Sequence, residues 1–190
     1  MAADTQGNDI TQVFVPVTGF IGVAPFGTAI PTPAEGATDP LTPALNAAFK
    51  KIGLLKTDGG PQWAWEQTGD AIEFWQDGYS LPSGLSNVTL AVTAAQTDPW
   101  VRELMAGTAP DENGYVNFDG GGHATQYVVF TEEIAKSGAI RRRVAANAQV
   151  QSVVEDRSTR GEVLGYAITF KINRSPETGN AHFGEWVLAA

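Results

Sequence analysis

The chain contains no cysteine, so disulfide bonds and thiolate metal ligands are excluded. Its only two histidines, His123 and His182, stand alone, without the spacing of a metal-binding motif. We expect His123, which follows three glycines, to be a solvent-facing loop residue. No apolar run approaches the roughly 20 residues of a membrane-spanning helix. The polar, acidic start of the chain (1–9) also lacks the basic and apolar regions of a signal peptide. We therefore expect no contact with membranes.

The sequence patterns of common catalytic sites are missing as well. The triple glycine at 120–122 lacks the Gly-Lys-Ser/Thr ending of a phosphate-binding loop, and no G-x-S-x-G nucleophile elbow is present. Adjacent carboxylates occur at Asp111-Glu112, Glu132-Glu133 and Glu155-Asp156, and we interpret them as solvated loop charges. A glycosidase would need two opposed carboxylates in a cleft. We predict that the protein is not an enzyme and binds no cofactor, and keep a hydrolase as the least favoured alternative.

Charged residues are scarce and unevenly placed. They make up 17% of the chain, and the net charge is −9. Residues 1–130 hold fourteen acidic and four basic side chains (−10), whereas residues 131–190 hold seven acidic and eight basic ones (+1). Binding of DNA through its phosphates requires Lys and Arg side chains. The acidic balance therefore argues against DNA binding, although DNA could still pass such a protein without being held.

The clearest pattern present is an alternation of apolar and polar residues over the last fifty residues. In residues 142–154, one face carries Val144, Ala146, Ala148, Val150 and Val154. In residues 162–172, one face carries Leu164, Tyr166, Ile168, Phe170 and Ile172. Period-two alternation is typical of half-buried strands. Since a polar turn (156–161) separates the two runs, we predict a long antiparallel hairpin with one face buried away from water.

Shorter patterns predict the remaining elements. We expect strands at 11–18, 62–68, 71–75, 87–93, 125–131 and 184–188, and a return strand at 19–25. Helices are predicted at 42–53, from its Thr-Pro start and a Leu45, Phe49, Ile52 stripe, and at 98–106, between Asp98 and Gly107. The pattern indicates a mainly β fold: a sandwich or barrel of about eight or nine strands with one or two short helices. We expect a flexible arm at 1–10 and a single domain at 11–190.

Two clusters of side chains are candidates for binding surfaces. Arg141, Arg142 and Arg143 form the only basic run, and we expect an exposed strand start that pairs with acidic residues of a neighbouring subunit, with a phosphate clamp as the alternative. Trp63 and Trp65 lie two apart on a predicted strand and so share a face. We interpret them as core or subunit-interface residues, with a sugar-binding platform as the alternative.

Three motifs in order resemble the major tail proteins of long-tailed, non-contractile phages. Residues 22–32 (GVAPFGTAIPT) are similar to the family's "APxGTxxP" opening. Residues 49–59, with FKKIGLL followed by DG, resemble its "F…LGxxxxDG" segment, and residues 72–76 (IEFWQ) its "I..WQ" strand. The second predicted helix and the closing hairpin also stand where the family has them, so the resemblance covers nearly the whole chain.

The resemblance implies a structural virion protein with a β-sandwich core and a self-assembling function. Copies would close into hexameric rings whose inner strands join in one barrel, and the rings would stack into a tail tube through which genome DNA passes. An acidic lumen would repel phosphate. We expect Glu66, Asp70, Glu73 and Asp77 to line the lumen, because they lie on or beside the strands of the strongest motif region. The alternative is a place on the outer wall or between rings.

Contacts between subunits are expected from loops and from the clusters above. The loop 26–43, with Pro31 and Pro33, and the segment 56–62 are candidates for ring-to-ring contacts, since proline-rich loops lose little freedom on docking. The inter-subunit candidates are Arg141, Arg142, Arg143, Trp63, Trp65, Pro31 and Pro33. Further implied partners are tape-measure, tail-terminator and tail-tip proteins, with assembly in the host cytoplasm. The alternatives are a related tube or terminator protein of a contractile tail or secretion system, and a soluble β-sandwich binding module.

Overall fold

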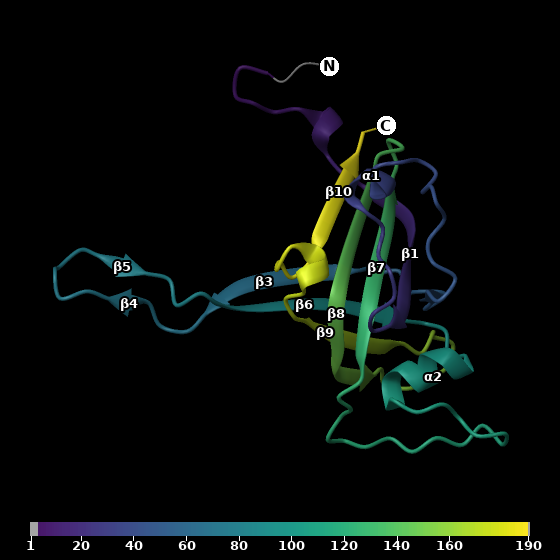
Figure 1. The fold of residues 1–190 in the computed structure, drawn as a ribbon. Helices are drawn as coiled ribbons and strands as arrows, with labels where there is room; N and C mark the ends of the chain where they lie inside the picture. Colours follow the sequence, from purple (N-terminus) through teal and green to yellow (C-terminus); the bar gives the residue numbers. More distant parts are fainter. Residues whose placement is uncertain (1–3, 190) are drawn as a thin grey trace.

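The computed structural model describes residues 4–189 and confirms a mainly β fold with few short helices (Figure 1). The strands are β1 (Pro16–Pro25), β2 (Lys50–Lys51), β3 (Gln62–Thr68), β4 (Ile72–Glu73), β5 (Ser80–Leu81), β6 (Leu85–Ala94), β7 (Gln126–Ala135), β8 (Ile140–Glu155), β9 (Tyr166–Ile172) and β10 (Gly184–Leu188). The helices are η1 (Ile10–Gln12), α1 (Pro33–Gly36), α2 (Pro99–Ala106) and η2 (Pro176–Thr178).

The long strand β8 joins two halves of one antiparallel sheet. The strand order is β2-β1-β7-β8-β9-β6-β3, and β10 also pairs with β8. The first half of β8 pairs with β10, at Ile140 to Val144, and the second half pairs with β9, from Ala148 to Glu155. In Figure 1 the strands β1, β7, β8 and β10 run across the direction of β3, β6 and β9. The fold is therefore two crossed sheet halves that share one strand.

Two hydrophobic clusters hold these halves together. The larger cluster lies between the two halves and α2, and includes Val129, Leu90, Phe170 and Leu104. The smaller cluster lies on the other face of β1, β7 and β8, where Phe130 and Val144 meet Leu45 and Phe49 from the loop before β2. The half built on β1, β7 and β8 is thus covered on both faces, in contrast to the half built on β3, β6 and β9.

The closing hairpin is present, but the single face expected for β8 is wrong in two places. A register shift against β7 puts Val144 in the smaller cluster and Ala148 in the larger one, on opposite faces of the sheet. The second place lies near the turn. Ile168, Phe170 and Ile172 of β9 are buried as predicted. In β8 the register shifts between Val150 and Ser152, which marks a bulge. A bulge inserts one extra residue and so exchanges the faces of the residues that follow. Val153 therefore packs on the core. Val154, which was predicted to lie on the buried face, is 61% exposed.

Several shorter elements agree closely with the sequence patterns. The strands β3 and β10 have the predicted bounds, and β6 buries Val88, Leu90 and Val92 on one face. Helix α2 is capped by the side chain of Asp98, which accepts from the backbone N–H of Val101, and ends at Gly107 with φ 78°. These elements carry local signals, namely a cap, a glycine stop and strict alternation.

Three predicted elements near the N-terminus differ from the structure. The strand expected at 11–18 begins only at Pro16, and residues 10–12 form η1. Residues 19–25 continue β1 instead of returning beside it, because β1 pairs along its length with β7. No helix forms at 42–49, and Lys50 and Lys51 form β2. Leu45 and Phe49 pack against the smaller cluster, whereas Ile52 packs in the larger one. Tertiary packing on the two sides of β1 therefore overrides the helical pattern of these three residues.

A long hairpin between β3 and β6 extends from the body of the molecule. The expected strand at 71–75 is paired only at Ile72 and Glu73, opposite Leu81 and Ser80. In Figure 1 this hairpin, with β4 and β5, points away from all other elements. The N-terminal segment before β1 also leads away from the sheet, and its flexibility stays a prediction.

Candidate assembly surfaces

The half-sheet of β3, β6, β9 and the end of β8 has one face that no cluster covers. On β6 and β9 this face carries Thr89, Ala91, Thr93, Ala167 and Thr169, none of which is buried. Lys171 and Glu66 contribute charges of opposite sign to it. The face is therefore built of small and mostly uncharged side chains, and we call it the open face.

Both edges of this half-sheet are unpaired in the described chain. The strand β3 pairs only with β6. On the other side, β7 pairs with β8 only as far as Gln149, which leaves the edge of residues 150–155 without a strand. Since each strand is antiparallel to the next, β3 runs antiparallel to β8. Open strand edges readily pair with another chain.

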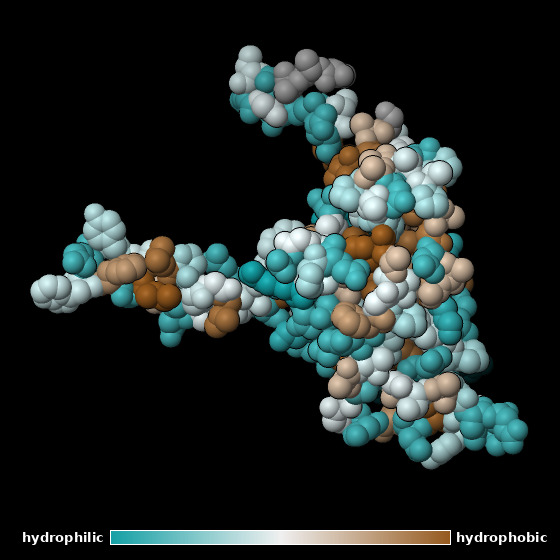
Figure 2. Space-filling model, in the orientation of Figure 1, coloured by the Kyte–Doolittle hydropathy of each residue, from teal (hydrophilic) through white to brown (hydrophobic). Residues whose placement is uncertain are grey.

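The projecting hairpin (69–84) carries exposed apolar side chains together with negative charge. Trp75 is 98% exposed, and Ile72, Phe74, Tyr79 and Leu81 are also exposed. Figure 2 shows brown, hydrophobic atoms along the hairpin. Exposed apolar groups gathered on one element mark an interaction surface.

The four expected lumen residues lie on β3 and this hairpin. Glu66 lies on the open face, where its carboxylate accepts a hydrogen bond from Asn87 Nδ2 at 3.1 Å. Asp70, Glu73 and Asp77 lie on the hairpin and are exposed. The structure thus places the four carboxylates along one continuous stretch of sheet and hairpin.

The three consecutive arginines pair with acidic residues of the same chain, and the expected exposed strand start is wrong for the buried Arg142. Arg141 makes two hydrogen bonds to Glu133, and Arg143 pairs with Glu185 of β10. Arg142 is 1% exposed and pairs with Glu132 at 2.6 Å. The partners face the arginines across the strand ladders. This also corrects the view of Glu132 and Glu133 as solvated loop charges, because both belong to β7.

Arg142 also holds a loop in place. Its guanidinium donates to the carbonyl oxygens of Gly36 and Thr38, at the end of α1. Charge-assisted hydrogen bonds of this kind are about twice as strong as neutral ones. The arginine thereby ties the loop 26–49 to the sheet.

The loop regions proposed for ring contacts are bonded to the rest of the protein at some residues and exposed at others. Pro33 is exposed, and its carbonyl oxygen accepts a hydrogen bond from the indole of Trp186 at 2.9 Å, while Pro31 is half-buried. In the segment 56–62, Lys56 pairs with Asp156 at 2.7 Å. The hydrogen bond raises the pKa of the Lys56 ammonium and lowers the pKa of the Asp156 carboxyl.

Trp63 and Trp65 share a face, as expected, but differ in burial. Trp63 is 9% exposed and belongs to the core, whereas Trp65 is 61% exposed. Both rings pack against Phe183, with centroid distances of 4.8 and 5.8 Å. Trp65 also lines a shallow pocket with His182 and Arg174. Burial and the nearby Arg174 charge lower the pKa of His182.

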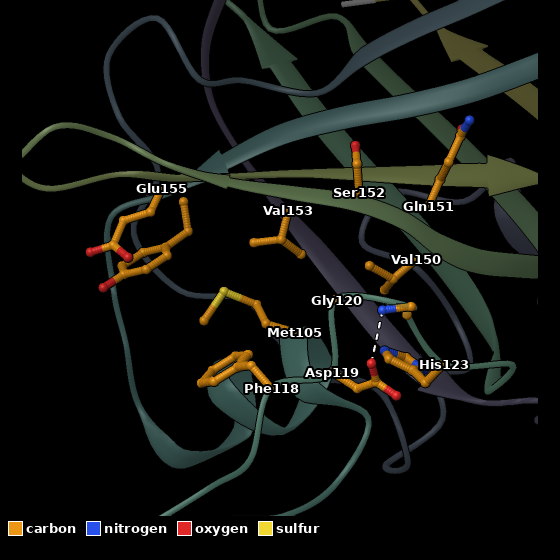
Figure 3. A pocket seen from close by; sticks show the side chains of 13 residues that line it. Met105, Phe118, Asp119, Gly120, His123, Val150, Gln151, Ser152, Val153 and Glu155 are labelled. Carbon is orange, nitrogen blue, oxygen red and sulfur yellow. Dashed lines mark hydrogen bonds between the residues drawn. The ribbon is translucent and has the colours of Figure 1, made fainter.

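A cleft lies beside the open edge of β8 (Figure 3). Its apolar walls are Met105 of α2, Phe118 of the following loop, and Val153 and Tyr166 of the closing hairpin. Asp119 and Glu155 supply negative charge at its border. Burial and the neighbouring Glu155 carboxylate raise the pKa of the Tyr166 phenol. This cleft could not be predicted from the sequence, because its walls come from four separate segments.

His123 differs from its predicted role as a solvent-facing residue. It is half-buried, with Nε2 3.2 Å from the carbonyl oxygen of Leu104 and its ring edge-on to Tyr127. The three glycines before it form a turn, in which Gly122 N–H bonds to the carbonyl oxygen of Asp119. Within residues 4–189, no group of three or more His, Asp or Glu side chains could hold a metal ion. No helix there is long and apolar enough to cross a membrane.

Comparisons with known proteins identify the family of this chain. Among solved structures, the SPP1 tail tube is similar, with 11% sequence identity, a TM-score of 0.44, and coverage of 90% of this chain and 77% of that chain. No curated protein matches the sequence. The sequence model of the family described as "Phage tail tube protein" matches residues 6–188. The chain therefore belongs to the phage tail tube protein family, and its resemblance to the major tail proteins is confirmed.

Proposed function

We propose that copies of this chain close into hexameric rings that stack into a tail tube, and that genome DNA passes through its lumen. The observation that carries the proposal is the half-sheet of β3, β6, β9 and the end of β8, with two open edges and one uncovered face. Pairing β3 of one copy with β8 of the next would continue the antiparallel order. Six such half-sheets would then form a closed barrel without exposed edges.

In this arrangement the open face lines the lumen. Its small, mostly uncharged side chains offer DNA phosphates few cations, and counterion-release binding depends on Lys and Arg. Glu66 offsets Lys171 on this face. Asp70, Glu73 and Asp77 on the hairpin add negative charge beyond the strand ends. DNA would therefore slide past the wall without sticking.

Stacking of the rings uses loops and arms. Loop 26–43, segment 56–62 and the N-terminal arm are the proposed ring-to-ring contacts. A ring has two different ends, so contacts between stacked rings are head to tail and generate an open filament. Tape-measure, tail-terminator and tail-tip proteins would then limit the tube length.

Electron microscopy of the purified protein over a concentration series tests this proposal. Hollow tubes of stacked six-fold rings are the expected result. A protein that stays monomeric in the presence of the tape-measure and tip proteins would contradict it.

Neutralising the proposed lumen carboxylates should slow DNA ejection without preventing assembly. The variant carries Glu66→Gln, Asp70→Asn, Glu73→Gln and Asp77→Asn, which keep side-chain size and remove repulsion of phosphate. The measurement is the rate of triggered DNA release from variant phage. The slowing should be strongest at low salt, because salt screens exposed charges.

The matched control removes exposed carboxylates elsewhere, at Glu112→Gln and Glu177→Gln. This control should eject DNA at the normal rate. Equal rates for the four-residue variant and the wild type at low salt would exclude these four residues from a role in DNA passage.

A further inference from the structure

We infer that Trp65 of each copy fills the cleft of the neighbouring copy in the same ring, between α2 and the end of β8. This inference rests on the proposed pairing of β3 with β8 and assigns it a side-chain anchor. The occupant is a second copy of this chain.

Trp65 and the cleft both lie on the core side of the half-sheet. Trp65 lies opposite Val88, which is buried in the larger cluster, so Trp65 projects from the core side of β3. Val153 lies opposite Ile168 and packs on the same cluster, so the cleft opens on the core side of β8. In a sheet continuous across two copies, both groups would lie on the same face, away from the open face.

The free edges of β3 and β8 match in length. The free edge of β3 is seven residues long (Gln62–Thr68), and the free edge of β8 covers residues 150–155. Antiparallel pairing with Trp65 opposite Val153 brings Thr68 opposite Val150 and Trp63 opposite Glu155. This register uses nearly the whole of both edges.

Trp65 and the cleft are chemically complementary. Trp65 is a 61% exposed aromatic side chain, and the cleft offers Met105, Phe118 and Tyr166 as apolar walls. Tryptophan is enriched among the residues that supply most of the binding energy at protein interfaces, in well-packed pockets without water. The charges match as well, since Arg174 lies beside Trp65 and Glu155 borders the cleft. Neither charge has an ion-pair partner within the described chain.

Cysteine cross-linking tests the contact directly, because the chain has no cysteine of its own. The variant Trp65→Cys/Val153→Cys is assembled and then oxidised or treated with a short bismaleimide. Within one copy the strand ladders place Ala64, next to Trp65, level with Gln149 of β8, four residues along the strand from Val153. The two positions are therefore further apart than the roughly 14 Å of three strand spacings, too far for a disulfide. We expect a ladder of cross-linked bands that ends at six subunits. Each single-cysteine variant, and the pair Trp65→Cys/Val187→Cys, should give no ladder.

A charge exchange provides a second readout that leaves Trp65 in place. Glu155→Arg and Arg174→Glu should each reduce tube yield strongly, and the double variant should restore it. Tubes that form without a Trp65–Val153 ladder, or single charge variants that assemble normally, would overturn the anchor while leaving the proposed tube intact. Failure of the wild-type chain to form tubes with its tail partners would instead contradict the proposed function.

Discussion

Replacing Arg142 by alanine is expected to lower the free energy of unfolding by about 3–5 kcal/mol, the typical cost of breaking a buried ion pair. The guanidinium is 1% exposed and bonds to Glu132, Gly36 and Thr38. Its removal would leave the Glu132 carboxylate without its close cation and two carbonyl oxygens without their charged donor. Chemical denaturation measures the loss, and hydrogen exchange should rise over residues 36–49.

Two control variants separate this network from a general effect of losing an arginine. Arg157→Ala changes an exposed turn residue and should leave stability within about 0.5 kcal/mol of the wild type. The double variant Arg142→Met/Glu132→Leu removes both charges and should recover much of the loss, because apolar pairs often replace buried ion pairs well. If Arg142→Ala were as stable as Arg157→Ala, the network would not hold the loop.

Replacing Gly19 by alanine is expected to cost about 3 kcal/mol, at the upper end of the range for overpacked sites. A Cβ at this position would lie 2.1 Å from the carbonyl oxygen of Glu132. That atom belongs to the backbone of β7, so β1 and β7 would have to move apart. The same shift would disturb Glu132, the partner of Arg142.

Gly60→Ala is the matched control for Gly19→Ala. Nothing lies within 4 Å of a Cβ added at Gly60, and its φ is not in the left-handed region. This change should be neutral or slightly stabilising, since alanine has less freedom to lose on folding. Thermal unfolding of the two variants side by side measures the difference. Equal midpoints would show that β1 and β7 tolerate the added methyl group.

The sequence predicted elements whose signals are local. The cap of Asp98, the stop at Gly107 and the alternation in β3, β6 and β9 depend on neighbours in the chain, and each element was found where it was expected. Residues 42–49 show the limit of this approach. The apolar residues of this segment have helical spacing. In the structure, however, Leu45 and Phe49 pack against the smaller cluster, and this tertiary packing cannot be predicted from the local sequence.

The assembly surfaces were less accessible to sequence analysis for two physical reasons. First, the partners of Arg141, Arg142 and Arg143 depend on which strands pair, so the ion pairs with Glu133, Glu132 and Glu185 follow only from the topology. Second, the bulge after Val150 exchanges the faces of the sheet on which Val153 and Val154 lie. No glycine marks this bulge in the sequence. The carboxylates at 66–77 could be named from the sequence, but their direction in an assembly remains a prediction.

The open face of β3, β6, β9 and the end of β8 should line a continuous lumen. A cryo-EM map of assembled tubes at side-chain resolution is the decisive test. We expect β3 of each subunit to pair with β8 of the next, with Thr89, Ala91 and Thr169 facing the lumen. A map in which this face lies on the outer wall, or in which neighbouring half-sheets do not pair, would contradict it.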